Sequence, residues 1–120
     1  MTMLINTKFT PFRASLYKKE PVQLYVELVN KSREDKKILY EISLGAGISL
    51  DKSGIKTHES KKFEPLKAGE KKFYYYQIFP KPIARNGETP ITISLIEPED
   101  ENYEFVKARY TKRITLTIEN

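Results

Sequence analysis

Few residues in this chain have the chemistry or the spacing of a catalytic site. His58 is the only histidine, and the absence of cysteine excludes disulfides, thiol nucleophiles and cysteine-bound metals. No serine lies in the Gly-x-Ser-x-Gly turn that presents a nucleophile. The glycines of GAGISL, residues 45–50, precede no predicted helix, which a phosphate-binding loop requires. We therefore predict that the protein is not an enzyme and has no cofactor.

Carboxylates are concentrated in the segment 97–104, and clustered carboxylate oxygens are the ligands that calcium prefers. They are Glu97, Glu99, Asp100, Glu101 and Glu104. Calcium takes about six to eight oxygen ligands, but this segment lacks the Asp/Asn alternation and the central glycine of an EF-hand loop. An acidic, solvated hairpin tip explains the cluster, and we predict no metal site.

Basic residues alternate with others in KARYTKR, residues 107–113. Lysine and arginine interleaved with tyrosine suit phosphate neutralisation and base stacking. On a strand, however, alternation places Lys107, Arg109 and Arg113 on one face and Lys112 on the other. These three residues are the candidate site for nucleic acid, which is the alternative partner.

The stretch KKFYYYQIF, residues 71–79, contains five aromatic residues, too many for one face of a strand. Gln77 indicates the register, because a buried amide without hydrogen-bond partners costs ~1–3 kcal/mol. If Gln77 faces outward, three side chains face the core and three aromatic rings face out. The inward set is Tyr74, Tyr76 and Ile78, and the outward set is Phe73, Tyr75 and Phe79.

The outward rings are the candidate partner-binding residues. In the segment 21–30 the outward row contains Tyr25 and Val29, and the two strands are neighbours in an immunoglobulin-type sheet. Tyr25, Phe73 and Tyr75 are therefore expected to form one apolar patch, and exposed patches often mark interaction sites. The alternative is that the rings only stabilise the sheet by cross-strand pairing, or are covered by the segment 3–9.

The elements that must position these residues are strands. Four runs alternate apolar and polar residues with a period of two, which indicates antiparallel strands with one wet face. They are 21–30, 36–44, 89–97 and 112–120. No ten-residue window shows the apolar stripe of a helix.

Less regular segments complete the predicted sheets. Pro11 is expected to break one edge strand or move it between sheets, and 60–64 reads as a short edge strand ending at Pro65. The connection 45–60 is expected to cross one end and tuck Ile48, Leu50 and Ile55 against it. Asn86-Gly87, within the predicted loop 80–90, is a tight-turn signal.

This pattern predicts an all-β, immunoglobulin-like Greek-key β-sandwich of about seven antiparallel strands, formed by residues 1–120 as a single domain. A closed barrel is the second choice, because the sixteen-residue excursion between strands does not suit its even strand spacing.

The overall charge is +5, from 21 Lys and Arg against 16 Asp and Glu. The interleaved signs are typical of a solvated surface, and the Lys/Glu bias is typical of thermophile proteins. There is no apolar run long enough for a membrane helix and no signal-like N-terminus. We expect a cytoplasmic protein, or an extracellular one if a signal or anchor precedes Met1.

Three segments carry a family resemblance. They are KKEPVQLYVELVNKS, FEPLKAGEKKFYYYQIFP and NGETPITISLIEPEDENYE. In this order they resemble CARDB-type and related immunoglobulin-like modules of archaea and bacteria, over residues 9–119. The resemblance implies a seven-stranded sandwich for adhesion, spacing or protein docking, usually without catalysis. Such modules are commonly exported in tandem, whereas we expect this chain to be a solitary module without a signal.

Together these observations predict a non-enzymatic interaction or structural module. It would dock a protein partner or a second copy through the outward aromatic face or through an exposed edge strand. The alternative is an accessory protein that binds nucleic acid through its basic strands.

Overall fold

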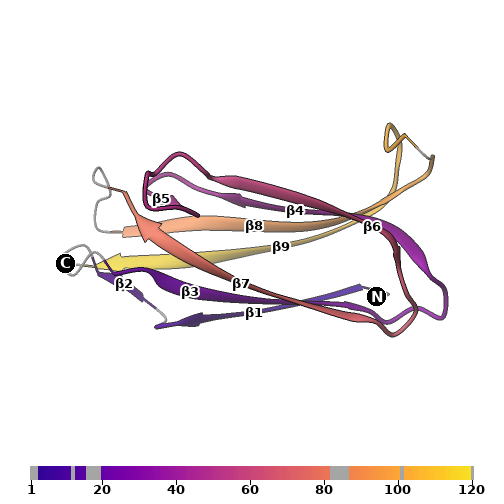
Figure 1. Ribbon diagram of the computed structural model, residues 1–120, viewed down its shortest axis with the longest axis horizontal. Helices are drawn as coiled ribbons and strands as arrows, with labels where there is room; N and C mark the ends of the chain where they lie inside the picture. Colours follow the sequence, from indigo (N-terminus) through magenta and orange to yellow (C-terminus); the bar gives the residue numbers. More distant parts are fainter. Residues whose placement is uncertain (1–2, 12, 16–19, 82–86, 101, 120) are drawn as a thin grey trace.

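Two β-sheets packed face to face form the protein (Figure 1). The computed structural model describes residues 3–11, 13–15, 20–81, 87–100 and 102–119. These residues form nine strands and no helix. The strands are β1 (Met3–Thr10), β2 (Arg13–Ser15), β3 (Val22–Asn30), β4 (Lys36–Leu44), β5 (Ile48–Ser49), β6 (His58–Leu66), β7 (Lys71–Pro80), β8 (Gly87–Pro98) and β9 (Val106–Glu119).

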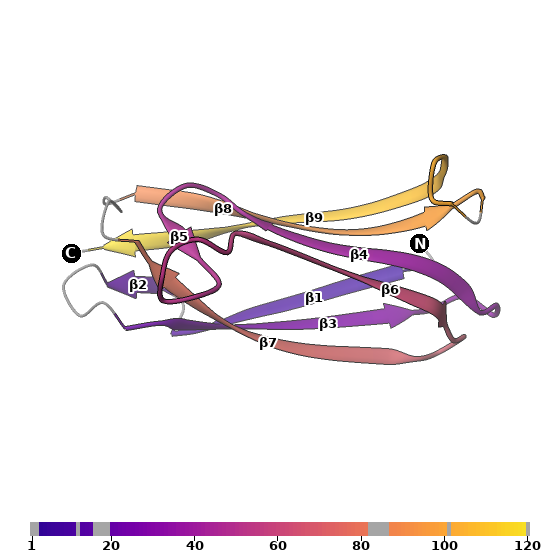
Figure 2. The same cartoon turned by 45° about the horizontal axis from the view of Figure 1, so that its top comes forward.

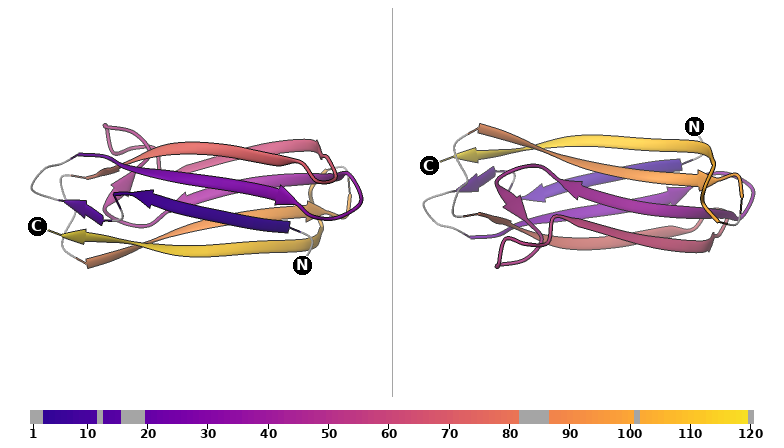
Figure 3. Two further views of the ribbon diagram at one scale, coloured as in Figure 1. Left: turned by 90° about the horizontal axis from the view of Figure 1, so that it is seen from below. Right: turned by 90° about the horizontal axis from the view of Figure 1, so that it is seen from above.

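One sheet has four strands and the other has five. The order is β1-β3-β7-β5 in the first, hereafter sheet A, and β2-β9-β8-β4-β6 in the second, sheet B. The layers extend along the longest dimension of a 47 × 25 × 19 Å molecule (Figures 1 and 2). β1 begins toward one end of this axis, and β9 ends toward the other (Figure 3).

The core lies between the sheets and consists of the alternate, inward residues of both. Leu24, Val26 and Leu28 of β3 face Ile38 and other residues of sheet B, all fully buried. Their partners in the core include Tyr40, Ile42, Ile78, Ile91, Ile93, Leu95 and Leu116. The alternation in the sequence therefore predicts the core-facing residues of β3, β4, β7 and β8, and the two-layer sandwich is confirmed over the barrel.

The prediction at Pro11 is confirmed. β1 belongs to sheet A, whereas β2, which follows Pro11, pairs in parallel with the end of β9 in sheet B. The segment predicted as an edge strand is β6 at the edge of sheet B, although β6 passes Pro65 and ends at Leu66.

The prediction of seven strands was too low. One extra strand, β2, is the part of the predicted edge strand that follows Pro11, and the other, β5, has two residues, too few for an alternating pattern to reveal it. Whether the connections form a Greek key stays a prediction.

The predicted loop 80–90 was too long at its C-terminal side, because β8 begins at Gly87. Proline has no N–H to donate to a neighbouring strand. Pro90 is tolerated in β8 because only its carbonyl oxygen is used on the β4 side, where it accepts a hydrogen bond from the Gly45 N–H at 2.8 Å. Asn86 of the predicted tight turn lies outside the described residues.

In the connection after β4, Ile48 is buried and Leu50 packs against the core, as predicted. Ile55 is 81% exposed, so its predicted burial was wrong. The Asp51 carboxylate accepts the backbone N–H groups of Gly54, Ile55 and Lys56, and this turn holds Ile55 away from the core.

One buried side chain joins two turns at the same end of the sandwich. The Asn30 amide donates to the carbonyl oxygens of Glu34 and Leu66, at 3.0 and 2.9 Å. Its Oδ1 accepts from the backbone N–H and the hydroxyl of Ser32. Asn30 thus ties the β3–β4 turn to the end of β6, and all of its hydrogen-bonding capacity is used.

Candidate docking face

The alternation of β7 places its aromatic rings on two faces, as Gln77 predicts. Gln77 is exposed, Ile78 is buried, and Tyr74 and Tyr76 pack partly buried against the core. On the outer face Phe73 is 52% exposed and Tyr75 is 65% exposed. The predicted register of this strand is therefore correct.

The outward rings of β7 meet Tyr25 on β3. The register pairs Tyr25 with Tyr75 and Glu27 with Phe73. The ring centroid of Tyr25 lies 6.1 Å from that of Phe73 and 5.2 Å from that of Tyr75. Tyr25, Phe73 and Tyr75 form one cluster on the outer face of sheet A, and we call them the aromatic trio.

A carboxylate fixes one edge of the trio. Glu27 accepts hydrogen bonds from the Asn6 side-chain amide at 2.8 Å and from the Tyr25 hydroxyl at 3.1 Å. The hydrogen bond from Asn6 is the main cause that lowers the pKa of Glu27 below its ordinary value. Partial desolvation, together with the bond to Glu27, raises the pKa of Tyr25. The ring of Tyr25 is therefore held in place by a charged acceptor on its own strand.

The predicted neighbours of the trio behave differently from one another. Phe79 is half-buried at the end of β7 beside β5, beyond Gln77, and the ring contacts of the described residues do not join it to the trio. Val29 is on the outer face as predicted, but it is buried, with Leu4 and Lys71 as its cross-strand neighbours. β1 lies beside β3 within the sheet, so it does not cover the rings.

A second aromatic cluster lies inside the sandwich. Tyr40 of β4 stacks on Tyr74 with centroids 5.4 Å apart, and its hydroxyl is 2.8 Å from that of Tyr76. Phe63 of β6 contacts both Tyr40 and Tyr74. The inward rings of β7 thus have partners across the core, which leaves the outward rings as the surplus.

The candidate nucleic-acid residues lie on β9 as alternation predicts. Lys107, Arg109 and Arg113 are exposed, whereas Lys112 faces the other way and its amine donates to the Ile5 carbonyl oxygen at 3.3 Å. The Lys107 amine also lies 4.0 Å from the carboxylate of Glu97. The basic segment is therefore divided between two faces.

The remaining polar candidates that the structure describes lie apart from one another or are engaged in local contacts. His58 opens β6 rather than lying in a loop, and it is exposed opposite Ser43 in the register. Glu97 is bound by the Lys36 amine at 2.9 Å, and Asp100 accepts the backbone N–H of Glu104 at 2.9 Å. Glu101 lies outside the described residues. Within the described ranges no three His, Cys, Asp or Glu side chains are grouped to hold a metal ion.

No protein-family model matches the chain, and the search of curated proteins found no match. Solved structures do match. The CARDB domain of a Pyrococcus furiosus protein, solved in complex with di-metal ions, superposes with a TM-score of 0.65 and 11% identity, covering 98% of this chain and 92% of that chain. The chain has a CARDB-like fold.

Two further structures match this chain in fold. A FixG-related protein from Vibrio parahaemolyticus gives a TM-score of 0.52 at 14% identity and covers 97% of both chains. A β-glucosidase from Listeria innocua, in complex with isofagomine, gives 0.56 at 15% identity, with 98% of this chain but only 16% of that chain covered. At these identities the likeness concerns the fold alone.

Sequence reasoning missed the polar support of the trio. Glu27 stands two residues after Tyr25 on the same outward row, which was a usable signal. Asn6 carried no comparable signal, because its position beside Glu27 depends on the pairing of β1 with β3.

Proposed function

We propose that this CARDB-like protein is a non-enzymatic docking module and that the aromatic trio is its docking face. The observation that carries the proposal is the pair of half-exposed rings, Phe73 and Tyr75, which contact Tyr25 outside a core that is complete without them. The apolar surface of a cluster of exposed rings is removed from water only when a partner covers it. Aromatic residues are also favoured anchors of protein interfaces.

The trio has a rigid base. Tyr25 is fixed by its hydroxyl bond to Glu27, and all three rings stand on adjacent, paired strands. Such preorganised rings lose little conformational entropy on binding. The occupant is a protein partner or a second copy of the chain.

The test replaces Phe73 and Tyr75 together by serine. We expect the Phe73→Ser/Tyr75→Ser protein to lose association while its melting temperature changes little, because both side chains lie outside the core. Molar mass by light scattering at low and high salt detects a second copy. Capture on immobilised protein detects another partner, as a band retained by the wild type and lost with the variant.

The matched control is Phe105→Ser/Val106→Ser, which removes two apolar side chains that are 63% and 45% exposed outside the trio. Equal association of the two variants contradicts the proposal. A large drop in melting temperature of the trio variant shows instead that the rings stabilise the sheet.

The second candidate function is nucleic-acid binding, which the exposed row of Lys107, Arg109 and Arg113 favours. Binding to phosphates weakens steeply with salt, because counterions are released, whereas an aromatic interface changes little. The same measurements at two salt concentrations therefore separate the two functions.

We also propose, from the sequence, that residues 1–120 form one domain. The described residues share one contiguous hydrophobic cluster, which supports this proposal. The described part of the chain contains no helix that could cross a bilayer.

A further inference from the structure

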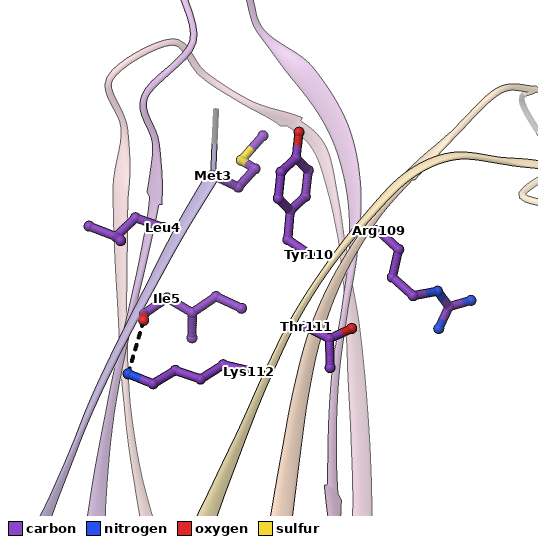
Figure 4. A pocket seen from close by; sticks show the side chains of 7 residues that line it. All are labelled: Met3, Leu4, Ile5, Arg109, Tyr110, Thr111 and Lys112. Carbon is purple, nitrogen blue, oxygen red and sulfur yellow. Dashed lines mark hydrogen bonds between the residues drawn. The ribbon is translucent and has the colours of Figure 1, made fainter. Parts of the chain in front are cut away.

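One flank of the sandwich has two strand edges without a strand partner among the described residues. β1 is the outer strand of sheet A, and on sheet B the short β2 pairs only with residues 117–119 of β9. The unpaired lengths of β1 and β9 face each other across a groove of about 450 Å³ (Figure 4). Its lining residues are Met3, Leu4, Ile5, Arg109, Tyr110, Thr111 and Lys112.

The backbone of β1 presents hydrogen-bonding groups to this groove. The Asn30 N–H donates to the Glu70 oxygen on the β7 side of β3, and in an antiparallel strand successive residues alternate their N–H and C=O groups between the two sides. The odd residues of β3 therefore face β1, where their partners are Leu4, Asn6, Lys8 and Thr10. The groups that remain for the open edge belong to Met3, Ile5, Thr7 and Phe9.

A side chain of β9 already uses one hydrogen-bonding group of the open edge of β1. The Lys112 amine crosses from β9 and donates to the Ile5 carbonyl oxygen at 3.3 Å (Figure 4). A lysine that points inward at an open edge disfavours pairing with neutral or basic strands, because its charge would be buried without a partner. An acidic strand would supply that partner, so the same lysine selects for it.

The charge of both edge strands agrees with this selection. β1 contributes one basic residue and no acidic one, and β9 contributes four basic residues and one acidic residue, Glu119 at its end. The flank is therefore much more basic than the chain as a whole, which has 21 basic and 16 acidic residues. Two copies of this flank would repel each other.

We propose that the groove binds an extended, acidic segment of another protein, which pairs with β1 as an added strand. Its inward side chains would alternate with outward ones, so that a carboxylate meets Lys112 and apolar residues cover Leu4. A peptide is favoured over nucleic acid because only a backbone of alternating donors and acceptors matches the open edge of β1. This proposal goes beyond the docking face and uses none of its rings.

The test measures fluorescence anisotropy of labelled synthetic peptides with the full chain. The first probe alternates valine and glutamate, the second alternates valine and lysine, and the third is the first with N-methyl groups along its pairing edge. We expect binding of the first peptide only. Lys112→Glu is expected to weaken binding of that peptide at least about tenfold and to favour the lysine peptide.

The control is Lys72→Glu, because Lys72 is also an inward, half-exposed lysine, on β7 at the opposite flank. It makes the same charge change and should leave peptide binding unaltered. Thr7→Pro removes an N–H from the open edge without removing a bond to β3, and it should abolish binding while the chain stays folded. If Lys112→Glu fails to fold, the N-methylated peptide and Thr7→Pro still decide.

Several results would overturn the proposal. Equal binding of the N-methylated peptide would mean charge attraction without strand pairing. An oligothymidylate that binds as tightly as the acidic peptide would identify a polyanion surface. A dimer that Lys112→Glu dissociates would identify a second copy as the occupant, and failure of the acidic peptide to bind at millimolar concentration would leave the groove without this ligand.

Discussion

At the residue scale, the Asn30 side chain is fully buried and makes four hydrogen bonds. Asn30→Ala removes the donors to Glu34 and Leu66 and leaves two carbonyl oxygens without them. We expect the free energy of unfolding to fall by about 2–3 kcal/mol. Denaturant unfolding monitored by circular dichroism measures the loss.

Asn6→Ala is the matched control, because Asn6 is exposed and its side-chain amide donates an exposed hydrogen bond to Glu27, beside the trio. It should change the free energy of unfolding by less than about 0.5 kcal/mol. Similar losses in the two variants would contradict the structural role of Asn30.

Individual residues show which parts of the site the sequence could predict. Gln77 gave the correct face of the aromatic residues from Phe73 to Tyr76, because an amide is rarely buried without partners. The predicted burial of Ile55 was wrong, since the apolar character of this residue does not show that Asp51 holds the backbone in a turn that exposes the side chain. The sequence could not predict the groove, because Ile5 and Lys112 are distant in sequence and come into contact only when both sheets have formed.

At the element scale, Gly45 directly follows β4 and lies against Thr89 and Pro90 of β8. A Cβ atom on Gly45 would lie 2.6 Å from Pro90 Cδ, 2.7 Å from Thr89 Oγ1 and 2.9 Å from the Pro90 carbonyl oxygen, so that something must shift to make room for it. Gly45→Ala should push these strands apart and cost ~1–3 kcal/mol, as overpacking does. Hydrogen exchange should quicken at the Leu44 amide, which donates to Thr57 at 2.8 Å.

Gly69→Ala controls for the loss of a glycine at the opposite end of the sandwich. Gly69 has a φ of 75°, and an added Cβ would meet no atom within 4 Å. This variant is destabilised by backbone strain alone, so exchange at Leu44 should stay slow relative to global unfolding. Fast exchange there in both variants would refute the local contact.

Long alternating strands were the elements that the sequence predicted best. β3 and β4 carry nine residues each, enough for a period of two to appear, whereas the two residues of β5 are too few. The pairing of strands within each sheet was beyond reach for most elements, because alternation fixes the face of a residue and not its neighbour.

At the scale of the whole molecule, Tyr40, which is buried, and Tyr76, which is partly buried, make the free energy of unfolding fall at alkaline pH. Burial raises the pKa of Tyr40 and of Tyr76, and the hydroxyl of Tyr40 raises that of Tyr76 further. The unfolded chain loses these protons above about pH 10, whereas the folded chain retains them. Their contribution to stability is therefore complete below about pH 10 and is lost as the pH rises.

We expect the free energy of unfolding to fall steeply above about pH 10. The free energy of unfolding of Tyr76→Phe should fall less steeply, because the substitution removes one of the two tyrosines whose pKa is raised most, even though the stability of this variant at neutral pH is lower. Denaturant titrations at a series of pH values measure both slopes. An equally steep decline in Tyr76→Phe would show that these hydroxyls do not control the transition.

The path of the chain has a mechanical consequence. β1 starts toward one end of the long axis and β9 finishes toward the other, each in a different sheet (Figures 1 and 3). Tension applied beyond Met3 and Glu119 runs parallel to both strands. It loads the ladders of β1 on β3 and of β9 on β8 in shear, so that many hydrogen bonds share the force at once instead of opening one after another.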